Sequence, residues 1–263
     1  MTRTADAFAR GKAFIPFVTA GDPDLATTAK LVRAMAASGA DLIEIGIPFS
    51  DPTAEGVTIQ QANLRSLSVG TTTDGVFDLV RDLRQGKTGE PVTIPLAFMT
   101  YANVVFSYGS ERFLSTCEEI GMNALILPDV PFEEKGEFDG VCKEHGIDLV
   151  SLIAPTSHER IKMIAREASG FVYCVSSLGV TGTRVHITTD IGAMVELVRA
   201  ATDVPVAVGF GISNPAQAAD MAAKSDGAIV GSAIVNIVAE KGRDAVEDVS
   251  AFVKEMADAV HQA

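Results

Sequence analysis

Two glutamates stand where their side chains could do acid–base chemistry. Glu44 lies inside the apolar run Leu42–Ile47 (LIEIGI), and Glu55 follows in a loop bounded by Pro52 and Gly56. An unpaired buried carboxylate costs several kcal/mol, so Glu44 is either ion-paired or a general acid or base with a raised pKa. A loop glutamate alone is usually solvated, but two carboxylates facing one cleft can divide acid and base roles.

Glycines form a second group of residues that could take part in ligand binding. Three pairs or triplets follow apolar runs: Thr181-Gly182, Gly209-Phe210-Gly211 and Gly231-Ser232. Backbone N–H groups and helix N-termini at such junctions bind phosphate, although glycines are also ordinary turn residues. The predicted phosphate-binding residues are Gly182, Gly211, Gly231 and Ser232. Such a site needs no basic patch.

Short apolar runs predict the strands that would position these residues. They are Ala13–Val18, Asp41–Gly46, Ile94–Thr100, Ala124–Leu127, Asp148–Ile153, Phe171–Val175, Val204–Val208 and Gly227–Val230. Their nearly continuous apolar character is typical of a parallel sheet that is covered on both faces.

Segments with apolar residues at helical spacing separate these runs. They are Leu25–Ser38, Thr73–Arg84, Glu111–Ile120, Glu133–His145, Ser157–Ala168, Ile191–Ala200, Pro215–Lys224 and Asp244–His261. Ser157 and Asn214 are predicted helix caps, the latter followed by Pro215. A short extra helix is expected around Ile59–Leu67.

Eight strands, each followed by a helix, predict an α/β fold, a (β/α)8 TIM barrel with extra short helices, as one domain over residues 1–263. An open doubly wound sheet is the alternative, but Val18–Pro23 (VTAGDP) lacks its glycine fingerprint. In barrels the active site lies at the carboxyl ends of the strands. Apolar residues predicted to line the pocket there are Phe17, Met99, Leu127, Tyr173 and Phe210, which suit a flat hydrophobic group with a phosphate tail.

Composition excludes several classes of function. The formal net charge is −13, which argues against nucleic acid as a partner. Cys117, Cys142 and Cys174 form no C-x-x-C pair, and the four histidines show no metal-ligand spacing, so no metal is expected and the thiols are expected to be free and buried. The chain has no apolar run of about 20 residues and no signal-like start, so we expect no membrane span and a cytoplasmic protein.

Seven segments together resemble the tryptophan synthase alpha subunit family, in order and spacing over essentially the whole chain. They are Ile15–Pro23, Glu44–Pro52, Leu64–Gly70, Met99–Asn103, Pro128–Pro131, Gly179–Thr183 and Gly209–Ser213. The most specific are EIGIPFSDP and GFGIS.

The resemblance implies a barrel lyase that cleaves indole-3-glycerol phosphate to indole and glyceraldehyde 3-phosphate in tryptophan biosynthesis. Glu44 would be the acid/base that protonates the indole ring carbon, and Tyr101 and Thr181 would join the substrate-binding residues. The resemblance also implies no cofactor in this chain, and a partner beta subunit that holds pyridoxal phosphate in an alpha2-beta2 heterotetramer.

The sequence departs from the family pattern at two loops. The family usually reads PLADG where this chain has Pro52–Gly56 (PTAEG), so Glu55 replaces the aspartate that accepts the indole N–H. The extra methylene adds about 1.5 Å of reach, and a misplacement of about 1 Å can cost roughly 100-fold in rate. The family's S-R-x-G-V-T-G reads Ser176–Gly182 (SSLGVTG) here, without the arginine. The two loops are expected to close over the substrate together.

Three other functions stay open from the sequence. The chain could release free indole without a partner, or could activate a beta subunit after losing turnover through Glu55. A different phosphate-ligand barrel, such as a Schiff-base aldolase, is disfavoured because no predicted strand carries a lysine.

Overall fold

A computed structural model describes residues 3–175, 190–209 and 211–263. Within them, nine strands form one sheet in which all neighbours are parallel, in the order β5-β4-β3-β2-β1-β9-β8-β7-β6. The strands are β1 (Ala13–Thr19), β2 (Ile43–Gly46), β3 (Leu96–Met99), β4 (Ala124–Ile126), β5 (Asp148–Leu149), β6 (Ser151–Ile153), β7 (Val172–Val175), β8 (Val206–Gly209) and β9 (Gly227–Val230). This arrangement confirms the predicted barrel.

The predicted fifth strand, Asp148–Ile153, is in fact two strands. β5 pairs with β4, whereas β6 pairs with β7, and Val150 stands between them. Strands in a barrel are tilted and staggered, so one segment can pair with one neighbour along its first half and with the other along its second. This segment therefore closes the barrel.

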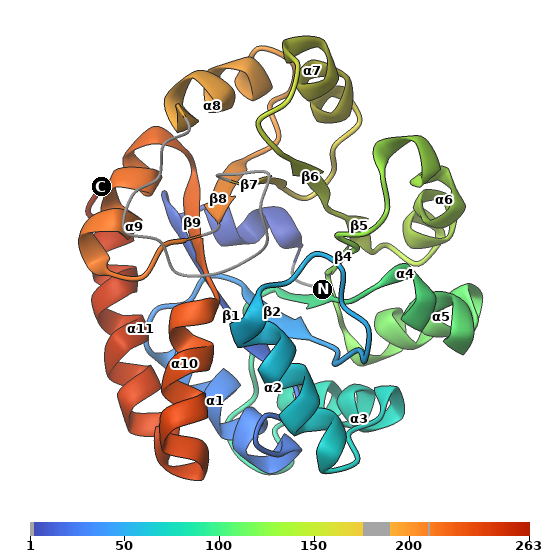
Figure 1. Ribbon diagram of the computed structural model, residues 1–263, viewed down its shortest axis with the longest axis vertical. Coiled ribbons are helices and arrows are strands. Elements are labelled where there is room, and N and C mark those ends of the chain that lie inside the picture. Colours follow the sequence, from blue (N-terminus) through green and yellow to red (C-terminus); the bar gives the residue numbers. More distant parts are fainter. Residues whose placement is uncertain (1–2, 176–189, 210) are drawn as a thin grey trace.

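Helices surround the strands on the outside (Figure 1). They are α1 (Leu25–Ala37), α2 (Val57–Ser68), α3 (Thr73–Gln85), α4 (Ala102–Tyr108), α5 (Ser110–Ile120), α6 (Gly136–Glu144), α7 (His158–Arg166), α8 (Ile191–Arg199), α9 (Pro215–Lys224), α10 (Ser232–Lys241) and α11 (Ala245–His261). Short 3-10 helices occupy Thr4–Phe8, Phe132–Glu134 and Gly242–Asp244. Both predicted caps are confirmed: Ser157 accepts a hydrogen bond from Arg160 N, and Asn214 from Gln217 N.

Two helices were not predicted from the sequence, and both follow strand ends. α4 is only seven residues long, too short for a clear helical period. Only Gly231 separates the end of β9 from α10, which begins at Ser232, so no loop marks the boundary between strand and helix. The extra helix at Ile59–Leu67 is confirmed and is longer than predicted, as α2. The predicted Glu133–His145 helix is divided into a 3-10 turn and α6.

Two apolar layers hold the barrel together. Small and branched side chains such as Ala13, Ile15 and Ile229 fill the interior, and a larger cluster packs the helices on the outer face of the strands. The three cysteines are free and buried, as predicted. Among the helices described, none is both long and apolar enough to cross a membrane.

The amino end of the barrel is held by a recurring polar contact. Side-chain oxygens of Asp41, Asn123 and Asp226 accept hydrogen bonds from the backbone N–H groups of Phe14, Leu96 and Val206, at 2.8, 3.0 and 2.9 Å. Each of these side chains also binds a basic group, from His261, Arg84 and Arg199 respectively.

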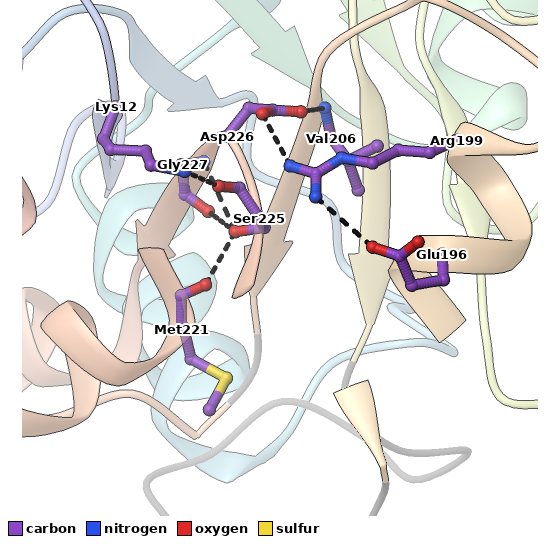
Figure 2. A network of polar contacts seen from close by, with 8 residues as sticks. All are labelled: Lys12, Glu196, Arg199, Val206, Met221, Ser225, Asp226 and Gly227. Carbon is purple, nitrogen blue, oxygen red and sulfur yellow. Dashed lines mark hydrogen bonds and ion pairs between the residues drawn. The ribbon is translucent and has the colours of Figure 1, made fainter. Parts of the chain in front are cut away.

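Figure 2 shows the network around Asp226. Ser225 Oγ donates to Met221 O or Gly227 O, and Lys12 Nζ donates to Ser225 O. The network therefore connects the starts of β1, β8 and β9 with α9, and it fixes this end of the barrel by paired polar groups.

Candidate active site

Glu44 lies inside the barrel, two residues before the carboxyl end of β2. Its neighbours across the sheet are Phe17 on β1 and Ala97 on β3. The residue is 1% exposed, and its Oε1 atom has no hydrogen-bond partner among the described residues. Burial raises the pKa of Glu44 to about 8. The carboxyl group is thus mostly protonated at neutral pH, which suits a proton donor.

Glu55 lies on the loop between β2 and α2, directly before Gly56, the N-cap of α2. It is 8% exposed, and its Oε2 accepts a hydrogen bond of 2.7 Å from Asn63 Nδ2. Burial raises the pKa of Glu55 to about 7, and the Asn63 hydrogen bond opposes this effect. Near neutral pH the group can therefore hold either charge state.

The two glutamates share one cavity of about 50 Å³ at the carboxyl ends of the strands. Its lining contains the predicted site residues Phe17, Met99, Tyr173, Gly211, Gly231 and Ser232, together with Ile59, Ile212 and Ile229. Sites for small molecules usually measure hundreds of Å³, so this cavity is narrow. A larger cavity of about 660 Å³ lies between the loops after β4 and β6, and it contains Leu127. Leu127 is therefore not among the residues that line the narrow cavity.

Glycines at the strand ends make room for the two aromatic rings of the cavity. A methyl group at Gly46 would lie 2.7 Å from Cζ of Phe17, and one at Gly209 would lie 2.6 Å from the ring of Tyr173. Carbon atoms not bonded to each other do not approach so closely without displacement. Gly46 and Gly209 thus leave the space that the rings of Phe17 and Tyr173 occupy.

Tyr101 lies outside the lining of the narrow cavity. Its hydroxyl accepts a hydrogen bond of 3.1 Å from Ala54 N, and its ring stacks on Phe49 with centroids 5.2 Å apart. Burial, followed by the charge of Glu55, raises the pKa of Tyr101. In the structure Tyr101 therefore supports the loop that carries Glu55.

Helix α2 is attached to the loop after β1 by buried polar contacts. Arg65 forms two hydrogen bonds to Asp22, of 2.8 and 2.7 Å, and Asp22 is 3% exposed. Ser66 Oγ donates to Ala20 O at 2.6 Å. Sequence reasoning missed Asn63, Arg65 and Ser66 as site-building residues. The available signal was two polar residues, Asn63 and Ser66, at helical spacing on the inner face of α2.

Three of the four predicted phosphate-binding residues, Gly211, Gly231 and Ser232, lie together near the start of α10. Gly231 is its N-cap and Ser232 is its first residue, and both line the cavity with Gly211. Backbone N–H groups at a helix N-terminus attract anions. The predicted residues Thr181, Gly182 and Phe210 lie outside the described residues. No cluster of three metal-ligating His, Cys, Asp or Glu side chains was found where side chains are described.

Fold and site together define a (β/α)8 barrel with an acid-bearing cavity at the carboxyl ends of its strands. The family model for the tryptophan synthase alpha chain matches residues 5–261. Tryptophan synthase alpha chains of Lactiplantibacillus plantarum and Lacticaseibacillus casei are 51% and 44% identical, over 91% and 99% of this chain and 89% and 96% of theirs.

Solved structures agree with this match. The alpha chain of Legionella pneumophila superposes with a TM-score of 0.86 at 34% identity, covering 99% of this chain and 97% of that one. Tryptophan synthase of Mycobacterium tuberculosis gives 0.87 at 32% identity, covering 99% and 98%. This chain belongs to the tryptophan synthase alpha chain family. The membership confirms the predicted enzyme class, a carbon–carbon lyase of tryptophan biosynthesis.

Proposed function

We propose that the chain cleaves indole-3-glycerol phosphate to indole and glyceraldehyde 3-phosphate, with Glu44 as general acid/base and Glu55 as the acceptor of the indole N–H. Glu44 donates its proton to the ring carbon that carries the glycerol phosphate chain. The carbon–carbon bond then breaks as the adjacent hydroxyl of that chain passes its proton to the Glu44 carboxylate and becomes the aldehyde, while the electrons of the broken bond return to the ring and restore indole. Ionised Glu55 stabilises the positive charge that develops on the protonated ring.

The observation that carries the proposal is the pairing of two buried carboxyl groups in one cavity. Glu44 has a pKa of about 8 and Glu55 a pKa of about 7, both raised by burial. Between these values the Glu44 acid and the Glu55 carboxylate coexist. We therefore expect a bell-shaped dependence of kcat/KM on pH, with its maximum between about 7 and 8.

The remaining predicted residues take supporting roles in this proposal. Phe17, Met99 and Tyr173 contact the indole, and Gly211, Gly231 and Ser232 bind the phosphate at the start of α10. Leu127, Tyr101, Thr181, Gly182 and Phe210 stay predictions as substrate-binding or phosphate-binding residues.

An indole-release assay tests the proposal. The purified chain should release indole from indole-3-glycerol phosphate, and Glu44→Gln should lower kcat by about 10²- to 10⁴-fold, the usual contribution of a general acid. Glu137→Gln, on the exposed face of α6, is the matched control and should leave kcat unchanged. Intact cleavage in Glu44→Gln would contradict the mechanism.

A partner beta subunit, carrying the pyridoxal phosphate, is part of the same proposal. Solved neighbours include a tryptophan synthase complex from Pyrococcus furiosus, with a TM-score of 0.84 at 34% identity and coverage of 94% and 98%. Addition of a beta subunit should accelerate indole release. Rapid release that a beta subunit does not change would favour a stand-alone lyase, and beta activation without release would favour a weakened activator.

We further propose that residues 1–263 act as one domain without a cofactor of their own. A cytoplasmic location and an alpha2-beta2 assembly stay predictions.

A further inference from the structure

We propose that Asn63 is a positioning residue that holds the Glu55 carboxylate at the place where it meets the indole N–H. The inference rests on the proposed role of Glu55 and deepens it. It explains how this loop holds a glutamate at a position where the family pattern has the shorter aspartate.

The contact itself is short, buried and directional. Asn63 Nδ2 donates to Glu55 Oε2 at 2.7 Å, and Asn63 is 5% exposed. A second contact from the same helix holds the main chain, because Gln60 Nε2 donates to Glu55 O at 2.7 Å. Side chain and backbone of Glu55 are thus both bound to the first two turns of α2.

The helix that provides these donors is fixed relative to the barrel. Arg65 and Ser66, within one turn of Asn63, bind Asp22 and Ala20 in the loop after β1. These contacts tie the position of Asn63 to the strand that carries Phe17, which faces Glu44 across the sheet. Asn63 therefore fixes the position of the Glu55 carboxylate relative to the other residues of the cavity.

A longer carboxylate needs such a contact more than a shorter one. Glutamate has one more rotatable bond than aspartate, and its carboxylate reaches about 1.5 Å further. A misplacement of about 1 Å can cost roughly 100-fold in rate. Anchoring one oxygen, Oε2, restricts the rotamers of Glu55.

An amide is a suitable anchor because it donates a hydrogen bond without adding charge. A lysine or arginine at the same place would pair with the charge of Glu55 and offset the stabilisation that this charge gives to the protonated ring. Among the described residues, the other titratable groups near Glu55 are Glu44, which lines the same cavity, and Tyr101, whose hydroxyl supports the loop and whose pKa Glu55 raises. Neither of these two groups brings a positive charge to the carboxylate.

The first test compares two amides on α2 in the full-length chain. Asn63→Ala should lower kcat for indole release by about 10- to 100-fold, as loss of a hydrogen bond to a charged group predicts, with less than about threefold change in KM. The acid limb of the pH profile should move to higher pH, because the hydrogen bond lowers the pKa of Glu55. Gln61→Ala, an exposed amide of the same helix, is the control. Equal kcat and pH profiles for both variants would overturn the proposal.

The isosteric variant Asn63→Asp separates positioning from folding. It keeps the shape of the side chain, and at a pH where both carboxyl groups are ionised it replaces the donor with an acceptor, so kcat should then fall at least as much as in Asn63→Ala, with folding checked by the thermal unfolding transition. Normal kcat in a folded Asn63→Asp would overturn the proposal.

A double-mutant cycle tests the dependence on side-chain length. An aspartate at position 55 is too short to reach Asn63 in the same way. Asn63→Ala should therefore cost less than about threefold in a Glu55→Asp background, against 10- to 100-fold in the parent. Equal costs in the two backgrounds would overturn the inference.

Glu55→Gln distinguishes failure of this inference from failure of the proposed function. Full activity in Glu55→Gln would refute the role of Glu55 and, with it, any positioning role for Asn63. Loss of activity in Glu55→Gln together with normal activity in Asn63→Ala would refute only the positioning role.

Discussion

The two ends of this barrel treat buried polar groups in opposite ways. At the amino end, Asp41, Asn123 and Asp226 each bind a backbone N–H of a neighbouring strand and a basic side chain. At the carboxyl end, Glu44 is buried with one oxygen that has no hydrogen-bond partner among described residues. Glu55 has a single described side-chain donor, Asn63.

This difference corresponds to a division between stability and chemistry. Paired polar groups stabilise the fold because the hydrogen bonds lost to water on burial are replaced. A carboxyl group left without such partners destabilises its charged form, and the raised pKa that results is what acid–base chemistry at neutral pH requires. In barrels of this kind, the amino end serves stability and the carboxyl end serves function.

The largest effect on stability should come from Glu44. Its pKa is about 8 in the fold and near 4.5 in the unfolded chain, so the unfolded state loses the proton first as pH rises. The stability that protonated Glu44 contributes is complete below about pH 4.5 and is lost as pH rises towards 8. Glu44→Gln removes this loss, so its free energy of unfolding relative to the parent should increase by roughly 3 kcal/mol between pH 4.5 and 7.

Urea unfolding across this pH range measures the difference. Glu137→Gln is again the control, since its carboxyl group is exposed. A difference between Glu44→Gln and the parent that does not change with pH would contradict the account of the carboxyl end.

A smaller loss of stability is expected from the amino end. Asp226→Ala removes the acceptors of Val206 N and Arg199 Nη2, and should destabilise the fold by about 2 kcal/mol. The rate of indole release at saturating substrate should stay within twofold of the parent. Chemical denaturation and the release assay measure the two quantities. Asp203→Ala, an exposed aspartate close in sequence, is the control. A large drop in kcat without loss of stability would contradict the assignment of stability to the amino end and chemistry to the carboxyl end.

Gly46→Ala should affect the carboxyl end by a steric route. The new methyl group would lie 2.7 Å from Phe17 Cζ, so the ring must move into the cavity beside Glu44. We expect kcat/KM for indole-3-glycerol phosphate to fall about tenfold, because small displacements near reacting groups are costly. Steady-state kinetics measures the ratio. Unchanged kinetics would show that the ring position is not critical.

The smallest effect is expected from His145, which lies between α5 and the end of α6. Its ring nitrogens contact Glu118 at 2.7 Å and Glu111 at 3.0 Å, and hydrogen bonding to Glu118, then Glu111, raises the pKa of His145 above 6.5. The stabilisation is complete below the ordinary pKa and is lost as pH rises through the raised value. His145→Gln should therefore destabilise the fold at pH 6 by less than about 1 kcal/mol, and by less at pH 9. A larger effect at pH 9 would contradict this sign.

Much of the fold could be predicted because strands and helices have recognisable patterns in the local sequence. The apolar runs around Ile15, Ile43 and Ile229 are continuous, and the caps Ser157 and Asn214 are correct. Some elements were not predicted correctly, among them α10 and the fifth strand. α10 was missed because only Gly231 separates it from β9, and the fifth strand was predicted as one segment because the residue types do not show which strand each half pairs with.

The site was predicted in part for the same reason. Most lining residues were found, because a residue at the carboxyl end of a strand points into a known region of a barrel. Leu127 lines the larger neighbouring cavity instead, and its role in substrate binding stays a prediction. Asn63 was missed because its partner, Glu55, lies on a loop. The path of that loop, and with it the contact to Asn63, is set only when α2 packs against the barrel.

The sequence by itself determined the order of strands and helices, the acid within an apolar strand, and the glycines at strand ends. These features depend on residue type and spacing, which act over a few neighbouring positions. Tertiary structure alone decided which polar groups become partners, as with Asp226 and Val206 or Arg65 and Asp22. It also decided the pKa values of Glu44 and Glu55, because side chains from distant strands and helices exclude water from both.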